Sequence, residues 1–67
     1  MDPKQRKNIK PGIHVLVVQK QDQRTGVTTE GYVDRLLTNS QYHPHGIKVM
    51  LQSGIVGRVC EILDDHN

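Results

Sequence analysis

Short stretches of alternating apolar and polar residues run through most of the chain, a pattern typical of β-strands rather than helices. The clearest stretch lies at residues 46–52, where alternate positions point to opposite faces: Ile47, Val49 and Leu51 alternate with Lys48, Met50 and Gln52. Three further stretches, at 13–19, 27–37 and 55–60, are also predicted strands. The first of these is apolar on both faces, as expected for a central or strongly curved strand.

The predicted strand at 27–37 contains an irregularity. Val33 and Leu36 are an odd number of positions apart, so both can face one core only if the strand bulges or changes sheets between them. Gly31 lies in the same strand, where a glycine usually marks a bend, a bulge or a close approach of backbones. We therefore expect this strand to be sharply bent.

The connections between the strands are polar and differ in length. Residues 19–29 form a long polar hairpin loop, residues 38–45 form a second polar connection, and Ser53-Gly54 is a tight hairpin turn. Residues 61–64 fit either one short helical turn near the C-terminus or a short closing strand.

Four or five short, bent strands in so short a chain favour an all-β fold, a small SH3-like barrel of the KOW type. Closing the barrel removes strand edges that would otherwise promote aggregation. An OB-fold typically needs a longer chain and often a helix. An open sheet of three or four strands that pairs as a dimer remains an alternative, because the core contains few aromatic residues.

The chain also repeats itself. Residues 12–17 (GIHVLV) return as 46–51 (GIKVML), and residues 31–37 (GYVDRLL) return as 57–63 (GRVCEIL). Residues common to both copies are expected to form the scaffold. Between the two motifs, 19 positions separate Gly12 from Gly31 but only 11 separate Gly46 from Gly57. Function is therefore sought in the unshared segments, 19–29 and 38–45, because loops on a rigid scaffold commonly carry it.

Composition limits the size and setting of the protein. A chain of 67 residues holds one domain, predicted at 11–64 with a tail at 65–67, and a domain of this size buries only about 60% of its unfolded surface. Cys60 is the only cysteine, so it can form neither an internal disulfide nor a thiolate zinc site, and a cytoplasmic location is expected. No apolar run approaches the length of a membrane span, and no signal-peptide pattern is present.

Charge is distributed unevenly. Residues 1–10 carry a net +3, residues 61–67 carry −3, and the middle of the chain carries +2. We expect residues 1–10 to form a flexible basic arm, which either attracts phosphate or is simply a solvated terminus.

In an SH3-like barrel the two unshared loops lie on the same side and flank a groove. Cations, rotatable hydrogen-bond donors and a stacking ring suit a phosphate backbone and an unstacked base. The candidate nucleic-acid-binding residues, with Ser40 beside them, are Lys20, Arg24, Thr38, Tyr42, His43, His45, Lys48 and Arg58.

Other chemistries receive less support. His43-Pro44-His45, with His14 as a third ligand, resembles a metal site, but a structural zinc site needs four ligands and the motif serves equally well as a polar turn. No serine, cysteine or carboxylate pattern indicates catalysis, and no glycine-rich phosphate loop is present. We expect a non-enzymatic protein with no metal and no cofactor.

Two resemblances add to these expectations. Residues 9–15 (IKPGIHV) followed by 31–33 (GYV) resemble a KOW-type module of ribosomal proteins and transcription elongation factors, which implies contact with RNA or ribonucleoprotein. The whole chain resembles the YwbE-like family of small uncharacterised proteins, which implies an SH3-like barrel. The segments that carry the second resemblance are 9–12 (IKPG), 17–26 (VVQKQDQRTG), 29–33 (TEGYV), 37–38 (LT), 43–49 (HPHGIKV) and 54–59 (GIVGRV).

The sequence thus predicts a binding module that contacts RNA or another nucleic acid through the groove between 19–29 and 38–45. The alternative is a protein-interaction adaptor that uses the same groove or an exposed strand edge, which the near-neutral middle and scarce aromatic residues favour. A monomer or weak homodimer with no membrane association is expected in either case.

Overall fold

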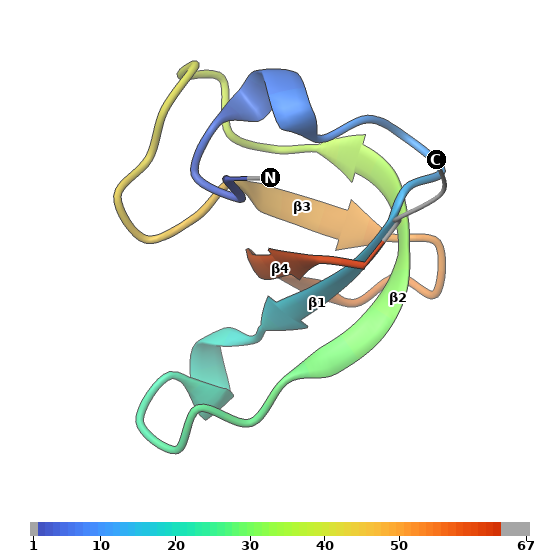
Figure 1. The fold of residues 1–67 in the computed structure, drawn as a ribbon. Coiled ribbons are helices and arrows are strands. Elements are labelled where there is room, and N and C mark those ends of the chain that lie inside the picture. Colours follow the sequence, from blue (N-terminus) through green and yellow to red (C-terminus); the bar gives the residue numbers. More distant parts are fainter. Residues whose placement is uncertain (1, 64–67) are drawn as a thin grey trace.

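A computed structural model describes residues 2–63. Four antiparallel strands, β1 (His14–Val18), β2 (Thr29–Leu36), β3 (Lys48–Leu51) and β4 (Val56–Ile62), follow one another in chain order. The last strand pairs with the first, so the sheet closes into a barrel (Figure 1). The predicted all-β, SH3-like barrel is confirmed, and the sheet is closed rather than open.

Aliphatic side chains from all four strands fill the barrel. The strands contribute buried residues at alternate positions, as the 46–52 pattern predicts, and Ile9 and Ile47 join them from outside the strands. No polar side chain is buried among the described residues. The fully or nearly fully buried set is Ile9, Val15, Val17, Val33, Ile47, Val49, Leu51 and Val59.

The sequence repeat corresponds to a repeat in strand register. In the first half His14 faces Tyr32 and Val15 faces Gly31; in the second half their counterparts pair in the same way, Lys48 with Arg58 and Val49 with Gly57. The two hairpins are therefore equivalent units that pair with each other twice, through β2–β3 and through β4–β1.

The bulges repeat as well. Asp34 is the extra residue where β2 pairs with β3, and Cys60 is the extra residue where β4 pairs with β1. These two residues occupy matching positions, each directly after the valine of a G-x-V motif. The bulge predicted between Val33 and Leu36 is confirmed, and it lets Leu36 pack against the core despite its odd spacing.

Close contacts explain why glycine recurs in the repeat. A Cβ on Gly31 would lie 2.7 Å from Leu51 Cδ1, and a Cβ on Gly57 would lie 2.9 Å from the Val18 carbonyl oxygen. Gly46 is doubly constrained, because its φ is +101° and a Cβ there would lie 2.3 Å from the Val59 carbonyl oxygen. These glycines serve the tight curvature of a four-stranded barrel.

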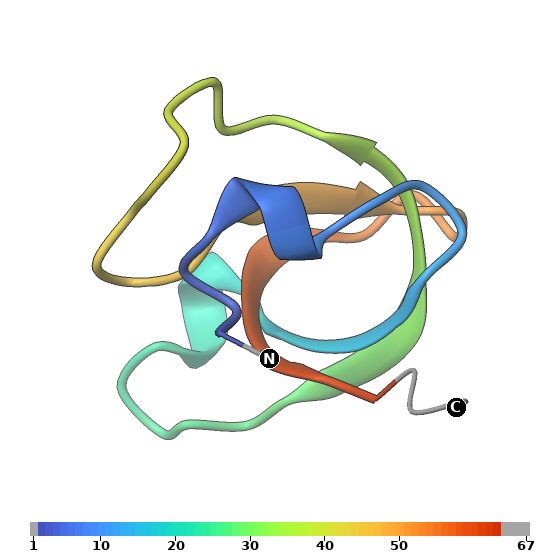
Figure 2. The same ribbon diagram turned by 45° about the horizontal axis from the view of Figure 1, so that its top comes forward.

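The N-terminal segment is part of the packed structure, which corrects the boundary drawn at Pro11. Ile9 is only 3% exposed and lies in the core. Backbone N–H groups of Arg6, His43 and Ile47 exchange hydrogen bonds between residues 3–6 and 41–47. The 3-10 turn η1 (Arg6–Asn8) lies over one end of the barrel (Figure 2). Residues 1–10 were expected to be a free arm because their sequence is polar; one buried isoleucine and backbone pairing fix most of them instead.

The C-terminal end of the described chain is a strand. β4 continues to Ile62, and Leu63 N–H donates to the His14 carbonyl oxygen at 2.8 Å. Of the two predictions for 61–64, the closing strand holds for residues 61 and 62, and the helical turn does not. Asp64 and the predicted tail at 65–67 lie outside the described residues. Within residues 2–63, no helix has the length and apolar character that crossing a membrane requires.

Candidate nucleic-acid interface

A row of three residues crosses the outer face of the barrel. Arg58 on β4 faces Val18 on β1 and Lys48 on β3. Val18 and Arg58 are half-buried, whereas Lys48 is exposed. Two cations therefore lie directly opposite each other on neighbouring strands, an arrangement that destabilises a sheet.

The long loop between β1 and β2 is folded into a turn beside this row. Its 3-10 turn η2 (Lys20–Asp22) is followed by a tight turn, in which Gly26, with φ +77°, donates its N–H to the Asp22 carbonyl oxygen at 2.8 Å. At its base, Gln19 Nε2 donates to Thr29 Oγ1 at 3.0 Å. The residues that make the first hairpin longer than the second thus form a defined structure that projects from the end of the barrel opposite η1 (Figure 1).

Two adjoining depressions lie between this loop and the row. The first, here called the lysine pocket, has a volume of about 430 Å³ and includes Lys20, Lys48 and Arg58 in its lining. The second, here called the histidine pocket, has a volume of about 560 Å³. The two pockets share Val18, Gln23 and Arg58. The histidine pocket is lined by Val18, Gln23, Gly26, His45 and Arg58.

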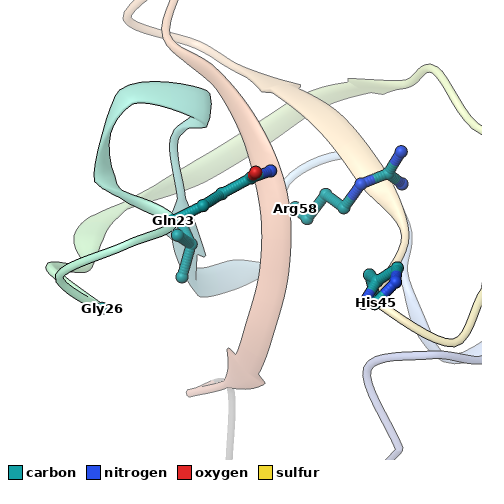
Figure 3. A pocket seen from close by; sticks show the side chains of 5 residues that line it. Gln23, Gly26, His45 and Arg58 are labelled. Atoms are coloured by element: carbon teal, nitrogen blue, oxygen red, sulfur yellow. The ribbon is translucent and has the colours of Figure 1, made fainter.

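Figure 3 shows how the histidine pocket is assembled. The Gln23 side chain is directed from the loop toward β4, and the Arg58 side chain extends from β4 toward the segment that carries His45. Arg58 Nη1 donates to the Gly46 carbonyl oxygen at 3.1 Å, which fixes the guanidinium beside that segment. The backbone passes close to the Val59 carbonyl oxygen at Gly46 and close to the Val18 carbonyl oxygen at Gly57, which brings these segments together.

The two histidines of the second loop lie close to each other. Their ring centroids lie 5.7 Å apart, and the His45 backbone N–H donates to His43 Nδ1 at 3.1 Å. Partial burial lowers the pKa of His43 below its ordinary value, and the nearby Arg58 and His45 lower it further. Desolvation is thus the main cause of the lowered pKa of His43, and the positive charge of Arg58 adds to it.

Among the described residues, the cations of the pockets form no ion pair with a carboxylate. Within residues 2–63, ion pairs join His14 to Glu30 and Arg35 to Asp34, and neither pair involves Lys20, Lys48 or Arg58. Cations that form no ion pair within residues 2–63 are available to attract an anionic ligand.

The structure places four of the eight predicted residues in the lining of the pockets and a fifth beside them. Lys20, His45, Lys48 and Arg58 line the pockets, and His43 lies next to His45. Arg24 is exposed in the loop but lines neither pocket. The expectation that all of residues 38–45 would flank one groove is thus corrected: only the end of this segment reaches the loop at 19–29.

Thr38 and Tyr42 have other surroundings. Thr38 Oγ1 accepts a hydrogen bond from the Lys48 backbone N–H at 2.8 Å, and its carbonyl oxygen accepts one from Arg6 Nε at 2.9 Å. Tyr42 pairs with Gln5 through a β-bridge, although its side chain is half exposed. Both residues anchor the N-terminal segment, which sequence analysis had left outside the domain.

Val18, Gln23 and Gly26 are pocket residues that sequence reasoning missed. Val18 counted as part of a strand, and the other two counted only as members of a polar loop. The length and polarity of that loop were a correct signal for its importance, but they did not indicate which side chains turn toward β4. No set of three metal-binding side chains is grouped closely enough to hold an ion in the described part of the chain. His14, the third ligand considered with His43 and His45, lies in β1.

The matching position of the first hairpin carries different chemistry. The His14 and Tyr32 rings stack with centroids 4.5 Å apart and an interplanar angle of 13°, and His14 Nε2 pairs with Glu30. This pair occupies the register position of Lys48 and Arg58. One hairpin thus presents a stacked ring pair beside a carboxylate, and the other presents two cations that form no ion pair within the described residues.

These features define a small closed antiparallel barrel with a two-part cationic site at one side. Residues 2–62 match the model of a family described as an uncharacterised conserved protein family, DUF2196. The chain is 46% identical over 63 residues to the uncharacterised protein YwbE of Bacillus subtilis (strain 168). The aligned region covers 94% of this chain and 97% of that protein. The chain belongs to this family, as its resemblance to YwbE-like proteins predicted. No solved structure matches it.

Proposed function

We propose that this protein is a non-enzymatic module that binds RNA through the lysine pocket and the neighbouring face of β3 and β4. The observation that carries the proposal is the direct cross-strand pairing of Lys48 with Arg58, with Lys20 beside them and no carboxylate in an ion pair with any of the three within residues 2–63. Like charges in this position cost stability, and a bound phosphate removes that cost.

Two further features support RNA as the ligand. The loop that holds Lys20 is longer than its counterpart in the second hairpin and is folded against the site, as a functional loop would be. The N-terminal half resembles KOW-type modules of ribosomal proteins and transcription elongation factors, which supports contact with RNA or ribonucleoprotein. The lone cysteine fits a reducing compartment, so the proposal places this function in the cytoplasm.

Fluorescence anisotropy with a labelled single-stranded RNA tests the proposal. We expect the logarithm of affinity to fall linearly with the logarithm of salt concentration, with a slope of about −0.7 for each phosphate contact. The variants Lys20→Gln and Lys48→Gln should each reduce this slope. Lys10→Gln is the matched control, because it removes the same charge from an exposed residue outside both pockets.

The same experiment defines failure. RNA binding that is absent, independent of salt, or equally weakened by Lys10→Gln would overturn the proposal. DNA of the same sequence should bind more weakly if the 2′-hydroxyl is recognised. Partners retained from a lysate after nuclease treatment, together with no binding to purified RNA, would favour a protein-interaction role for the same surface.

A further inference from the structure

We propose that the site holds one unstacked nucleotide, with its base in the histidine pocket and its phosphate in the lysine pocket. This inference rests on the proposed RNA binding and adds that the base itself is contacted. The two pockets adjoin and share Val18, Gln23 and Arg58, yet their linings differ in kind. Lys20 and Lys48 line only the lysine pocket, whereas His45 and Gly26 line only the histidine pocket.

The histidine pocket has the surfaces that a flat aromatic ring requires. Val18 contributes an apolar, half-buried wall, and His45 contributes an exposed imidazole. The Arg58 guanidinium is planar and is held by the Gly46 carbonyl oxygen, so it offers a fixed face on which a base can stack. Gly26 leaves its part of the rim open, because a Cβ there would have no neighbour within 4 Å.

Gln23 supplies a polar group that a phosphate site does not need. Its amide carries both donors and an acceptor, which match the edge of a base, whereas a phosphate accepts only. Within the described chain the Gln23 side chain makes no hydrogen bond. By contrast, the Gln19 side chain donates to Thr29, and the Gln21 side chain donates to Gln19. Its amide is directed toward β4 and is free to meet a ligand (Figure 3).

The shape of the site selects a single strand. A volume of about 560 Å³ lies within the range of about 300–1,000 Å³ typical of small-molecule pockets, so one base fits and several stacked base pairs do not. A base enters such a pocket only when it is not paired or stacked in a duplex. The inferred ligand is therefore single-stranded RNA with at least one exposed base.

The test compares two labelled RNA oligonucleotides of equal length, one intact and one with its bases removed, so that both present the same phosphates. We expect the wild-type protein to bind the intact strand about tenfold more tightly. Gln23→Ala and Arg58→Lys should reduce that difference to about twofold; Arg58→Lys keeps the charge but loses the planar surface. Gln21→Ala is the matched control, because Gln21 lies in the same loop and lines only the lysine pocket.

The outcomes separate this inference from the proposed function. Equal, salt-dependent binding of the two strands would overturn the base pocket and leave RNA binding in place. An equal loss of preference in Gln21→Ala would also overturn it, because a general disturbance of the loop would then explain the effect. Failure of both strands to bind would overturn the proposed function and this inference together. A base preference lost in Gln23→Ala and retained in Gln21→Ala establishes it.

Discussion

Lys48 and Arg58 face each other across β3 and β4 in the register position that His14 and Tyr32 hold across β1 and β2. The scaffold of the two hairpins is the same, down to matching bulges at Asp34 and Cys60. The side chains displayed on that scaffold differ: one pair stacks, and the other repels. The barrel thus uses one hairpin unit twice and gives the second unit the cations of the proposed binding site.

Because the two cations repel each other, removing one of them should increase the stability of the protein and weaken its binding to RNA. Lys48→Gln should raise the free energy of unfolding by about 0.5 kcal/mol, because like charges on directly opposed residues are destabilising. The same variant should weaken RNA binding. Urea unfolding and anisotropy on one protein sample measure both effects. Lys10→Gln should change neither, and a loss of stability in Lys48→Gln would contradict the interpretation.

Gly46 should be the least replaceable glycine of the chain's turns. Gly46→Ala should lower the free energy of unfolding by about 3 kcal/mol or more, because the left-handed backbone is strained for alanine and its Cβ would collide with the Val59 carbonyl oxygen. Gly26→Ala is the control. It also has a positive φ but an open environment, so it should cost only about 1 kcal/mol. Denaturant unfolding measures both, and equal losses would show that the close approach at Gly46 is unimportant.

The lowered pKa of His43 predicts that stability falls on acidification. The unfolded state gains its proton near the ordinary value of 6.5, before the folded state does, so the stabilising contribution is complete above that pH and is lost as pH falls through the lower folded pKa. His43→Asn should reduce this dependence, because an amide does not titrate in this range. Its oxygen can still accept the hydrogen bond from the His45 N–H, so the local structure is kept. Unfolding curves recorded from about pH 7.5 to about pH 5, a range that includes the ordinary histidine pKa of 6.5, measure the slope.

The same pKa reports on ligand binding. Arg58 helps to lower the pKa of His43, so a phosphate bound at Arg58 should raise it. An NMR titration of the His43 ring with and without single-stranded RNA measures the change. A pKa that stays constant at saturating RNA would place the ligand away from Arg58.

Cys60 should react slowly with alkylating reagents. Partial burial raises the pKa of its thiol, and the neighbouring Glu61 carboxylate raises it further, so less thiolate is present near neutral pH. The rate of iodoacetamide labelling should be lower in the native protein than in urea, and Glu61→Gln should increase the native rate. Native labelling as fast as in urea would contradict the expected protection.

The sequence by itself determined the strands, the repeat and the bulge. These features have local physical causes: alternation fixes which face of a strand is apolar, and the odd spacing of Val33 and Leu36 requires an extra residue between them. The glycines of the repeat were correctly assigned to the scaffold for the same reason. Closing the barrel then leaves few ways to join four bent strands.

Only the tertiary structure decided which polar residues meet. Residues 1–10 gave no local sign that Ile9 would enter the core, because a single apolar residue in a polar segment has no periodicity. Thr38 and Tyr42 were assigned to the groove from their place in the chain. In the structure the Thr38 carbonyl oxygen accepts a hydrogen bond from the Arg6 side chain, and Tyr42 forms a β-bridge with Gln5. Gln23 reaches the site because η2 folds the loop back toward β4. The direction of a loop side chain depends on such long-range contacts, and no local pattern encodes them.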